Sequence, residues 1–327
     1  MKLLRRLHID PFILAIVTAA VTGTLLPAEG WGVPTVDWLS NITVFALFYL
    51  FGARLSPAET LSGLKNWRLH LLILSFTFIM FPILGQLMSL AFGWLLPHGL
   101  IMGIVYISIL PSTVQSSIAF TSIAKGNVPA AIVSASTSNI LGVFLTPALA
   151  ALLMQSQNFV VTPESILEIG LQIFLPFVLG QVTRRWTGKW IEAHPQTKIV
   201  DRGTIVIVVY SAFSSAKREN IWAQVNWWEI ALVLAIALTM LGIMLFATWI
   251  TPKKLGFPRG DVIAIQFCGT KKSLATGLPM ASVLFSGTPV GLLILPLVLF
   301  HQAQLMACAT LADRYSKQVE DTANESE

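Results

Sequence analysis

The chain has 327 residues, of which 55% are hydrophobic and only 11% are charged, and its mean hydropathy is +0.73. Soluble domains carry about 25% charged residues, so this composition excludes a water-facing surface of ordinary size. We expect an all-α polytopic membrane protein in a lipid bilayer. The net charge of +5 does not indicate a nucleic-acid partner, because the basic residues are scattered between apolar runs, as in loops that face anionic lipid.

Charge-poor stretches, separated by clusters of Pro, Gly and Asn, predict ten transmembrane helices, since each crossing takes about 20 apolar residues. The predicted helices span residues 11–27, 38–54, 68–95, 100–124, 128–154, 165–183, 200–216, 228–250, 261–285 and 289–312. The first resembles a signal peptide because basic residues precede it. It lacks a small-residue cleavage site and many spans follow, so we expect it to be retained.

The distribution of basic residues predicts the orientation, because cytoplasmic loops are enriched in Lys and Arg. With the N-terminus inside, 17 of the 21 basic residues fall in cytoplasmic segments, and only Lys217 and Arg218 fall in external loops. We therefore expect both termini in the cytoplasm and an integral protein of the inner or plasma membrane. The acidic segment 313–327 is predicted to be a disordered tail.

The ten spans form two halves of five, residues 1–157 and 158–312. An offset of 157 residues aligns the halves, and it places Gly23 on Gly180 and the segment 112–116 on 269–273. Because each half has an odd number of helices, the two copies would cross the membrane in opposite directions. Inverted repeats of this kind are typical of secondary transporters.

The aligned segments are also where helices are predicted to break. Pro111 lies within the fourth span, where it removes a backbone donor and disfavours helix at the preceding residue. In the ninth span, Gly269 and Thr270 precede two lysines. Pro and Gly often merely kink membrane helices, but a matched pair of breaks indicates a transport site, because half-helix ends present dipoles at the midplane.

Lys271 and Lys272 are unusual, because a charged residue at the centre of a span costs about 2.5–3.5 kcal/mol. In a helix that begins at Asp261, Lys271 lies about 15 Å along the axis, too deep to snorkel easily. Such an amine can balance the negative end of a half-helix, attract an anionic substrate or release a proton. Lys272 is the stronger candidate because it aligns with Gln115, and snorkelling is the alternative for both lysines.

Further polar residues complete the predicted substrate and ion site. Its members are Lys271, Lys272, Thr270, Ser273, Ser112, Thr113, Gln115, Ser116, Ser117, Ser136, Asn139 and Gln266. Small polar residues of the fifth span serve helix packing at least as often as ligand binding, and Asn139 is the main exception. His301 is a candidate proton relay, although a hydrogen-bonded interior histidine is the commoner role.

Three stretches carry a family resemblance. They are Asn66-Trp67-Arg68-Leu69-His70-Leu71 through Phe81-Pro82, Gly126-Asn127-Val128 through Leu145-Thr146-Pro147, and Cys268-Gly269-Thr270-Lys271-Lys272-Ser273-Leu274 through Gly277-Leu278-Pro279-Met280. The chain resembles the bile acid:sodium symporter family, in its YfeH-like, SBF-like branch. The resemblance implies two inverted five-helix repeats, a panel domain of helices 1, 2, 6 and 7, and a core domain of helices 3–5 and 8–10 in which broken helices 4 and 9 cross.

The resemblance also indicates which sodium-ligand positions of the family are altered in this chain. Sodium-coupled members hold sodium with an acidic residue and a Gln-Asn pair on helix nine, and these positions hold Phe267 or Gln266 and the pair Lys271-Lys272 here. Hydroxyl ligands on helix five align with Ala131 and Ala135. We therefore expect both sodium sites to be degraded and a lysine ammonium to occupy the space that sodium fills in relatives. Bile acid is a doubtful substrate on this basis.

The sequence thus predicts a secondary transporter of a small organic anion that works by alternating access, with H+ or Na+ open as coupling ion and no other cofactor. The alternative is a regulatory membrane protein, for example of ion homeostasis, that keeps the fold without transporting. No Gly-x-Ser-x-Gly or His-Glu-x-x-His motif and no intramembrane Asp pair is present, so we do not expect an enzyme. The solute, the direction of transport and the oligomeric state stay open.

Overall fold

The computed structural model describes residues 11–54, 66–154, 170–218, 220, 223, 225–285 and 290–324, and the regular secondary structure in these ranges is helical. Six of the described helices are long and apolar enough to cross a membrane: Gly32–Arg54, Trp67–Phe92, Val128–Leu153, Ile199–Arg218, Trp227–Lys254 and Val290–Gln318. The described secondary structure confirms the prediction of an all-helical fold, and the length and composition of these six helices fit a membrane protein. By its internal contacts the chain divides into two compact units.

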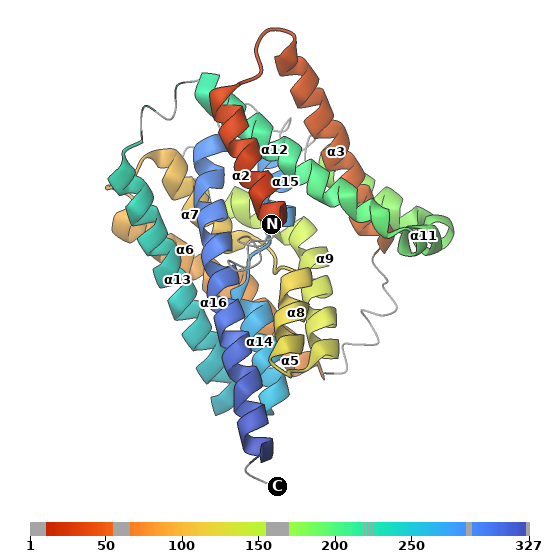
Figure 1. Ribbon diagram of the computed structural model, residues 1–327, viewed down its shortest axis with the longest axis vertical. Coiled ribbons are helices and arrows are strands. Elements are labelled where there is room, and N and C mark those ends of the chain that lie inside the picture. The colour runs from red at the N-terminus through yellow and green to blue at the C-terminus, as the bar shows by residue number, and fades with distance from the viewer. Residues whose placement is uncertain are drawn as a thin grey trace. The chain divides into compact units, whose positions relative to one another are not determined.

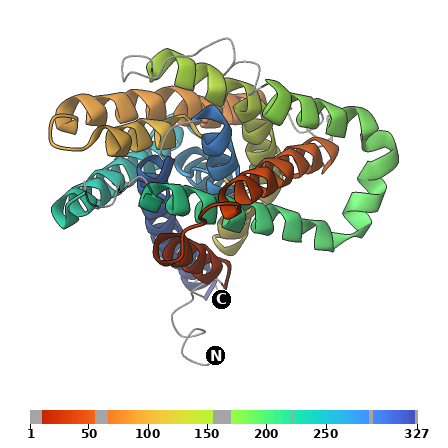
Figure 2. The same ribbon diagram turned by 90° about the horizontal axis from the view of Figure 1, so that it is seen from above.

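The first unit contains residues 1–55, 161–225 and 278–294. Its elements are α2 (Pro11–Leu25), α3 (Gly32–Arg54), the π-helix η4 (Gly170–Phe174), α11 (Leu175–Ala193), the 3-10 turn η5 (Pro195–Thr197) and α12 (Lys198–Arg218). Helix α2 lies against α12 (Figure 1), and α3 lies against both α11 and α12 (Figure 2). Residues 155–169, which include the start of the predicted sixth span, lie outside the described residues.

Glycines set the close approach of helices in this unit. A Cβ atom at Gly180 of α11 would lie 2.1 Å from the carbonyl oxygen of Tyr49 on α3. A Cβ atom at Gly23 of α2 would lie 2.7 Å from the carbonyl oxygen of Tyr210 on α12. Small residues allow membrane helices to pack backbone to backbone in this way, and both helix pairs depend on them.

The second unit contains residues 56–160, 226–277 and 295–327. Its elements are α5 (Trp67–Ser75), the π-helix η2 (Phe76–Met80), α6 (Phe81–Phe92), α7 (His98–Ile109), α8 (Gln115–Ile123), α9 (Val128–Leu153), α13 (Trp227–Lys254) and α14 (Arg259–Thr270). Helices α15 (Leu274–Leu284) and α16 (Val290–Asn324) have residues in both units. The predicted spans 100–124 and 261–285 are each interrupted, as α7 and α8 and as α14 and α15.

The last helix is longer than predicted. Helix α16 continues to Asn324 (Figure 1), so residues 313–324, predicted to be a disordered tail, are helical and that expectation is corrected. Tyr315 fixes this end of the helix, because its ring stacks on Trp249 at 4.8 Å and its hydroxyl donates to Gln266 Oε1 at 3.0 Å. An ion pair between Lys317 and Asp313, one turn apart, adds to it.

Candidate functional site

Two extended segments interrupt helices in the second unit and lie side by side. Helix α7 ends at Ile109, and Leu110 is extended with φ −72° and ψ 153°. Helix α14 ends at Thr270, and Lys271 is extended with φ −87° and ψ 149°. The backbone N–H of Ser273 donates to the carbonyl of Pro111 at 2.9 Å. The two breaks predicted from Pro111 and from the glycine before the lysines are thus joined by a main-chain hydrogen bond.

Side chains of α9 hold both breaks in place. The amide of Asn139 donates to the carbonyl of Ser112 at 2.7 Å, and its Oδ1 accepts from the hydroxyl of Thr276 at 2.9 Å. The hydroxyl of Ser138 accepts from the backbone N–H of Ser112 at 3.0 Å. The hydroxyl of Ser112 in turn donates to the carbonyl of Cys268 at 2.6 Å. Asn139, singled out from the sequence, therefore links one interruption to the other.

The ammonium of Lys272 is bound by three main-chain carbonyls. Its Nζ donates to the carbonyl oxygens of Thr77 at 2.8 Å, Ser108 at 2.7 Å and Leu110 at 2.8 Å. The side chain is 0% exposed, and Nζ lies 4.3 Å from the centre of the Phe81 ring. An ammonium has three N–H donors, so its hydrogen-bonding capacity is fully used.

The carbonyl of Thr77 lacks a donor within its own helix because of a proline. In the π-helix η2 the backbone N–H of Phe81 donates to the carbonyl of Phe76, five residues earlier. The next residue, Pro82, has no N–H to give to Thr77. The Thr77 carbonyl therefore has no donor within its own helix, and Lys272 supplies one.

The carbonyl of Ser108 lacks a donor within its own helix for a related reason. In a continuing helix it would accept from Ser112, four residues later, but the Ser112 N–H is engaged with Ser138. The residue three positions later is Pro111, which has no N–H. Together with Leu110, Ser108 presents carbonyls at the C-terminal end of α7, where the helix dipole is negative. The ammonium of Lys272 meets this end.

The backbone of Lys272 is also fixed, by Gln304 of α16. The side chain of Gln304 accepts from the Lys272 N–H at 2.9 Å and donates to the Lys272 carbonyl at 2.8 Å. The same amide nitrogen lies 2.8 Å from Nδ1 of His301. Since an amide nitrogen only donates, Nδ1 of His301 acts as the acceptor. His301 is thus hydrogen-bonded to Gln304, the residue that binds the backbone of Lys272.

Lys271 has different surroundings although it is equally buried, at 0% exposure. Its Nζ lies 3.7 Å from the centre of the Phe120 ring and 5.7 Å from that of Phe267. No described residue accepts a hydrogen bond from it. The two adjacent lysines therefore differ: the ammonium of Lys272 is saturated by acceptors, whereas that of Lys271 faces aromatic rings.

The structure places the remaining predicted residues in three groups. Thr113, Ser116 and Ser117 form one hydroxyl cluster, with Ser117 donating to the carbonyl of Phe267 at 3.1 Å. Thr270 bonds to Thr248, Ser273 bonds to Thr276, and Gln266 donates to the carbonyl of Leu245. Gln115 is exposed and Ser136 half-buried. Among the described residues neither side chain has a hydrogen-bond partner, and Lys272 bonds to main-chain carbonyls and not to Gln115, the residue with which it aligns.

Sequence reasoning missed several residues of this arrangement. Thr77, Phe81 and Gln304 contact Lys272 but lay outside the predicted site. Only Thr77 carries a local signal, the Pro five residues after it. Gln304 is an uncharged polar residue in an apolar span, which marks it as unusual without naming its partner.

Comparison with known proteins shows the family to which the chain belongs. The SBF-like CPA transporter family matches residues 10–317. The chain is 46% identical over 316 residues to "Uncharacterized protein PA2026" of Pseudomonas aeruginosa, covering 96% of this chain and 95% of that protein. It is 42% identical over 325 residues to "Putative symporter YfeH" of Escherichia coli K12, covering 98% and 96%. It is 30% identical over 323 residues to "Sodium/bile acid cotransporter 7" of Mus musculus, covering 95% and 94%.

These matches extend over nearly the full length of both partners, and they confirm the resemblance found in the sequence motifs. The described helices fit an integral membrane protein. The chain therefore belongs to the SBF-like CPA transporter family, a family of membrane transporters and not of enzymes.

Proposed function

We propose that the protein is a secondary active transporter of a small organic anion in which the ammonium of Lys272 takes the place of a coupling cation. The observation that carries this proposal is the set of three carbonyls, from Thr77, Ser108 and Leu110, around Nζ. Unwound backbone carbonyls and half-helix C-terminal ends are the groups that coordinate sodium in transporters with broken helices. Transport is then independent of sodium, and is either coupled to protons or uncoupled.

The fifth-helix positions support the same conclusion. Ala131 and Ala135 of α9 have no side-chain oxygen, and the Ala131 carbonyl accepts from the thiol of Cys268 at 3.7 Å. The Ala135 carbonyl accepts from the amide of Asn139 at 3.0 Å. Both carbonyls already accept hydrogen bonds within the protein, so these two positions of α9 supply poor oxygen ligands for a sodium ion.

The proposed architecture is ten crossings in two inverted five-helix repeats, residues 1–157 and 158–312, with both termini in the cytoplasm. At the offset of 157 residues, α2 corresponds to α11 and α3 to α12. The α2–α12 and α11–α3 pairs are therefore equivalent, and each packs through an aligned glycine, Gly23 or Gly180. Helices 1, 2, 6 and 7 form the panel, helices 3–5 and 8–10 form the core, and alternating access is their relative movement.

The two lysines have separate roles in this proposal. Lys272 is a tethered cation that neutralises the C-terminal end of α7. Lys271 has no hydrogen-bond acceptor among the described residues and is the charge available to an anionic solute. The hydroxyl of Thr113 in the first break, those of Ser116 and Ser117 at the start of α8, and the amide of Asn139 on α9 complete the polar surface of the site.

Counterflow in proteoliposomes with a panel of organic anions tests the proposal. We expect exchange of at least one anion at equal rates in sodium and potassium, and loss of exchange in Lys271→Gln. The thermal midpoint of the purified protein should also be the same in both salts. If sodium raises that midpoint more than potassium does, and Lys272→Ala leaves the difference unchanged, the lysine does not replace the cation. A folded protein that exchanges none of the anions would favour the regulatory alternative.

A further inference from the structure

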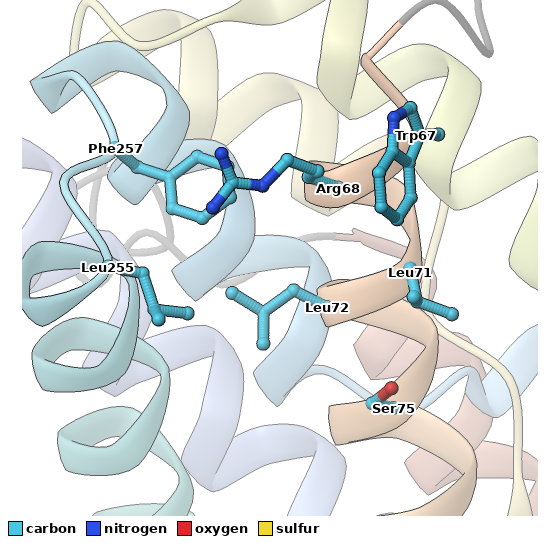
Figure 3. A pocket seen from close by; sticks show the side chains of 7 residues that line it. All are labelled: Trp67, Arg68, Leu71, Leu72, Ser75, Leu255 and Phe257. Atoms are coloured by element: carbon cyan, nitrogen blue, oxygen red, sulfur yellow. The ribbon is translucent and has the colours of Figure 1, made fainter.

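A cavity of about 210 Å3 lies in the second unit, between the start of α5 and the turn that joins α13 to α14 (Figure 3). Its lining residues are Trp67, Arg68, Leu71, Leu72, Ser75, Leu255 and Phe257. The five lining residues of α5 form two rows with four-residue spacing, Trp67, Leu71 and Ser75 in one and Arg68 and Leu72 in the other. One face of α5 therefore forms one wall of the cavity. The lining side chains are apolar apart from the hydroxyl of Ser75, the guanidinium of Arg68 and the indole N–H of Trp67.

The guanidinium belongs to Arg68, which extends across the cavity to the ring of Phe257 (Figure 3). Its Cζ lies 5.8 Å from the ring centre, within the range of a cation–π contact. No described carboxylate forms an ion pair with it. Asp261, on the helix that follows, is 7% exposed and already accepts hydrogen bonds from Asn66 and Asn127. The charge of Arg68 is therefore available to an anion in the cavity.

The cavity lies where headgroups meet hydrocarbon. Trp67 is 63% exposed at the first residue of a continuous helical run, Trp67–Phe92, of 26 residues. At ~1.5 Å per residue this run is about 39 Å long, which exceeds the hydrocarbon thickness of about 30 Å. Trp67 is thus at the interface, where tryptophans gather. Leu71, 57% exposed, is one turn deeper.

We propose that this cavity binds an anionic phospholipid, with its phosphate on Arg68 and the first carbons of one acyl chain against Leu71, Leu72 and Leu255. Arginine binds phosphate oxygens bidentately. At about 30 Å3 for each water-sized group, the cavity holds about seven such groups, enough for a phosphate and the adjoining carbons. A free inorganic anion would meet mostly apolar wall, which cannot replace its water.

Thermal unfolding with added lipid tests this site. The purified protein would be titrated with palmitoyl-oleoyl phosphatidylglycerol, with phosphatidylcholine of the same chains, and with inorganic phosphate. We expect a saturable rise of the midpoint with phosphatidylglycerol alone. Arg68→Gln should weaken phosphatidylglycerol binding about fivefold, from the attraction of one surface arginine to anionic lipid. Leu72→Trp, which fills the cavity without changing charge, should abolish the rise.

Arg185→Gln is the matched control, because Arg185 also lies over an aromatic ring, that of Trp186 at 3.7 Å, and does not line the cavity. It should retain the wild-type response. An equal response to phosphatidylcholine, or to phosphate, would overturn the proposal in favour of a neutral lipid or a soluble anion. An equal loss in Arg68→Gln and Arg185→Gln would show only general surface charge, and would also overturn it. None of these outcomes depends on whether the protein transports an anion.

Discussion

Replacing Lys272 by methionine removes an ammonium while keeping a side chain of similar length. In the wild type this ammonium donates to the carbonyls of Thr77, Ser108 and Leu110 at 2.7–2.8 Å. The substitution leaves all three oxygens without that donor in a place where Lys272 itself is 0% exposed. The carbonyls of Thr77 and Ser108 have no replacement donor in their own helices, because Pro82 and Pro111 have no N–H and the Ser112 N–H is engaged with Ser138.

The expected loss of stability in Lys272→Met follows from these three unpaired carbonyl oxygens. A buried acceptor left without a donor costs about 1–3 kcal/mol, and the removal of a desolvated charge offsets part of the sum. We expect the free energy of unfolding to fall by about 3 kcal/mol at the low end of these values. For a chain of this size the thermal midpoint would then fall by roughly 5 °C or more.

The neighbouring lysine supplies the control. Lys271 is equally buried but has no acceptor among the described residues, and its Nζ faces Phe120 at 3.7 Å. Lys271→Met therefore removes an unpaired charge and places a thioether against aromatic rings, which is a favourable contact. Its midpoint should stay level or rise. Tryptophan fluorescence during heating measures both variants, and equal midpoints for the two would refute the assignment of separate roles.

Two further substitutions test the packing and the link between the breaks. Asn139→Ala removes the bonds to the Ser112 carbonyl and the Thr276 hydroxyl, and should lower stability by about 1–3 kcal/mol; Ser136→Ala on the same helix, which removes no described hydrogen bond, should be neutral in the same denaturation assay. Gly180→Ala places a Cβ atom 2.1 Å from the Tyr49 carbonyl and should sharply reduce the yield of folded protein. Gly203→Ala meets nothing within 4 Å and should raise stability by up to about 1 kcal/mol; similar yields for both glycine variants would contradict the close approach of α3 and α11.

The sequence was sufficient for the breaks, because Pro111 and the Gly269-Thr270-Lys271-Lys272 run are local signals that act on the backbone directly. It was also sufficient to identify Asn139 as an unusual residue. It was not sufficient for the binding partners of Lys272. The repeat alignment makes Lys272 and Gln115 equivalent positions, which does not identify the groups that Lys272 contacts, and Gln115 is exposed at the first position of α8.

Tertiary packing explains this difference. The acceptors of Lys272 are backbone carbonyls, which have no sequence identity of their own and become available only where neighbouring prolines and a serine remove their usual donors. Gln304 comes from another helix, α16, and nothing in a single sequence fixes the register of that helix against the break at Lys272. The tail was mispredicted for a similar reason, since its composition is polar while Tyr315 is fixed by Trp249 and Gln266.

Cation rescue of Lys272→Ala tests the central claim most directly. This variant would keep the three carbonyls and leave space where the ammonium was, so its thermal midpoint would be titrated with sodium, potassium and methylammonium chloride at constant ionic strength. We predict a saturable rise with sodium or methylammonium that exceeds the rise with potassium, and none of these responses in the wild type or in Lys272→Met. If the alanine variant shows no saturable response, or the wild type shows the same one, Lys272 does not fill a cation site.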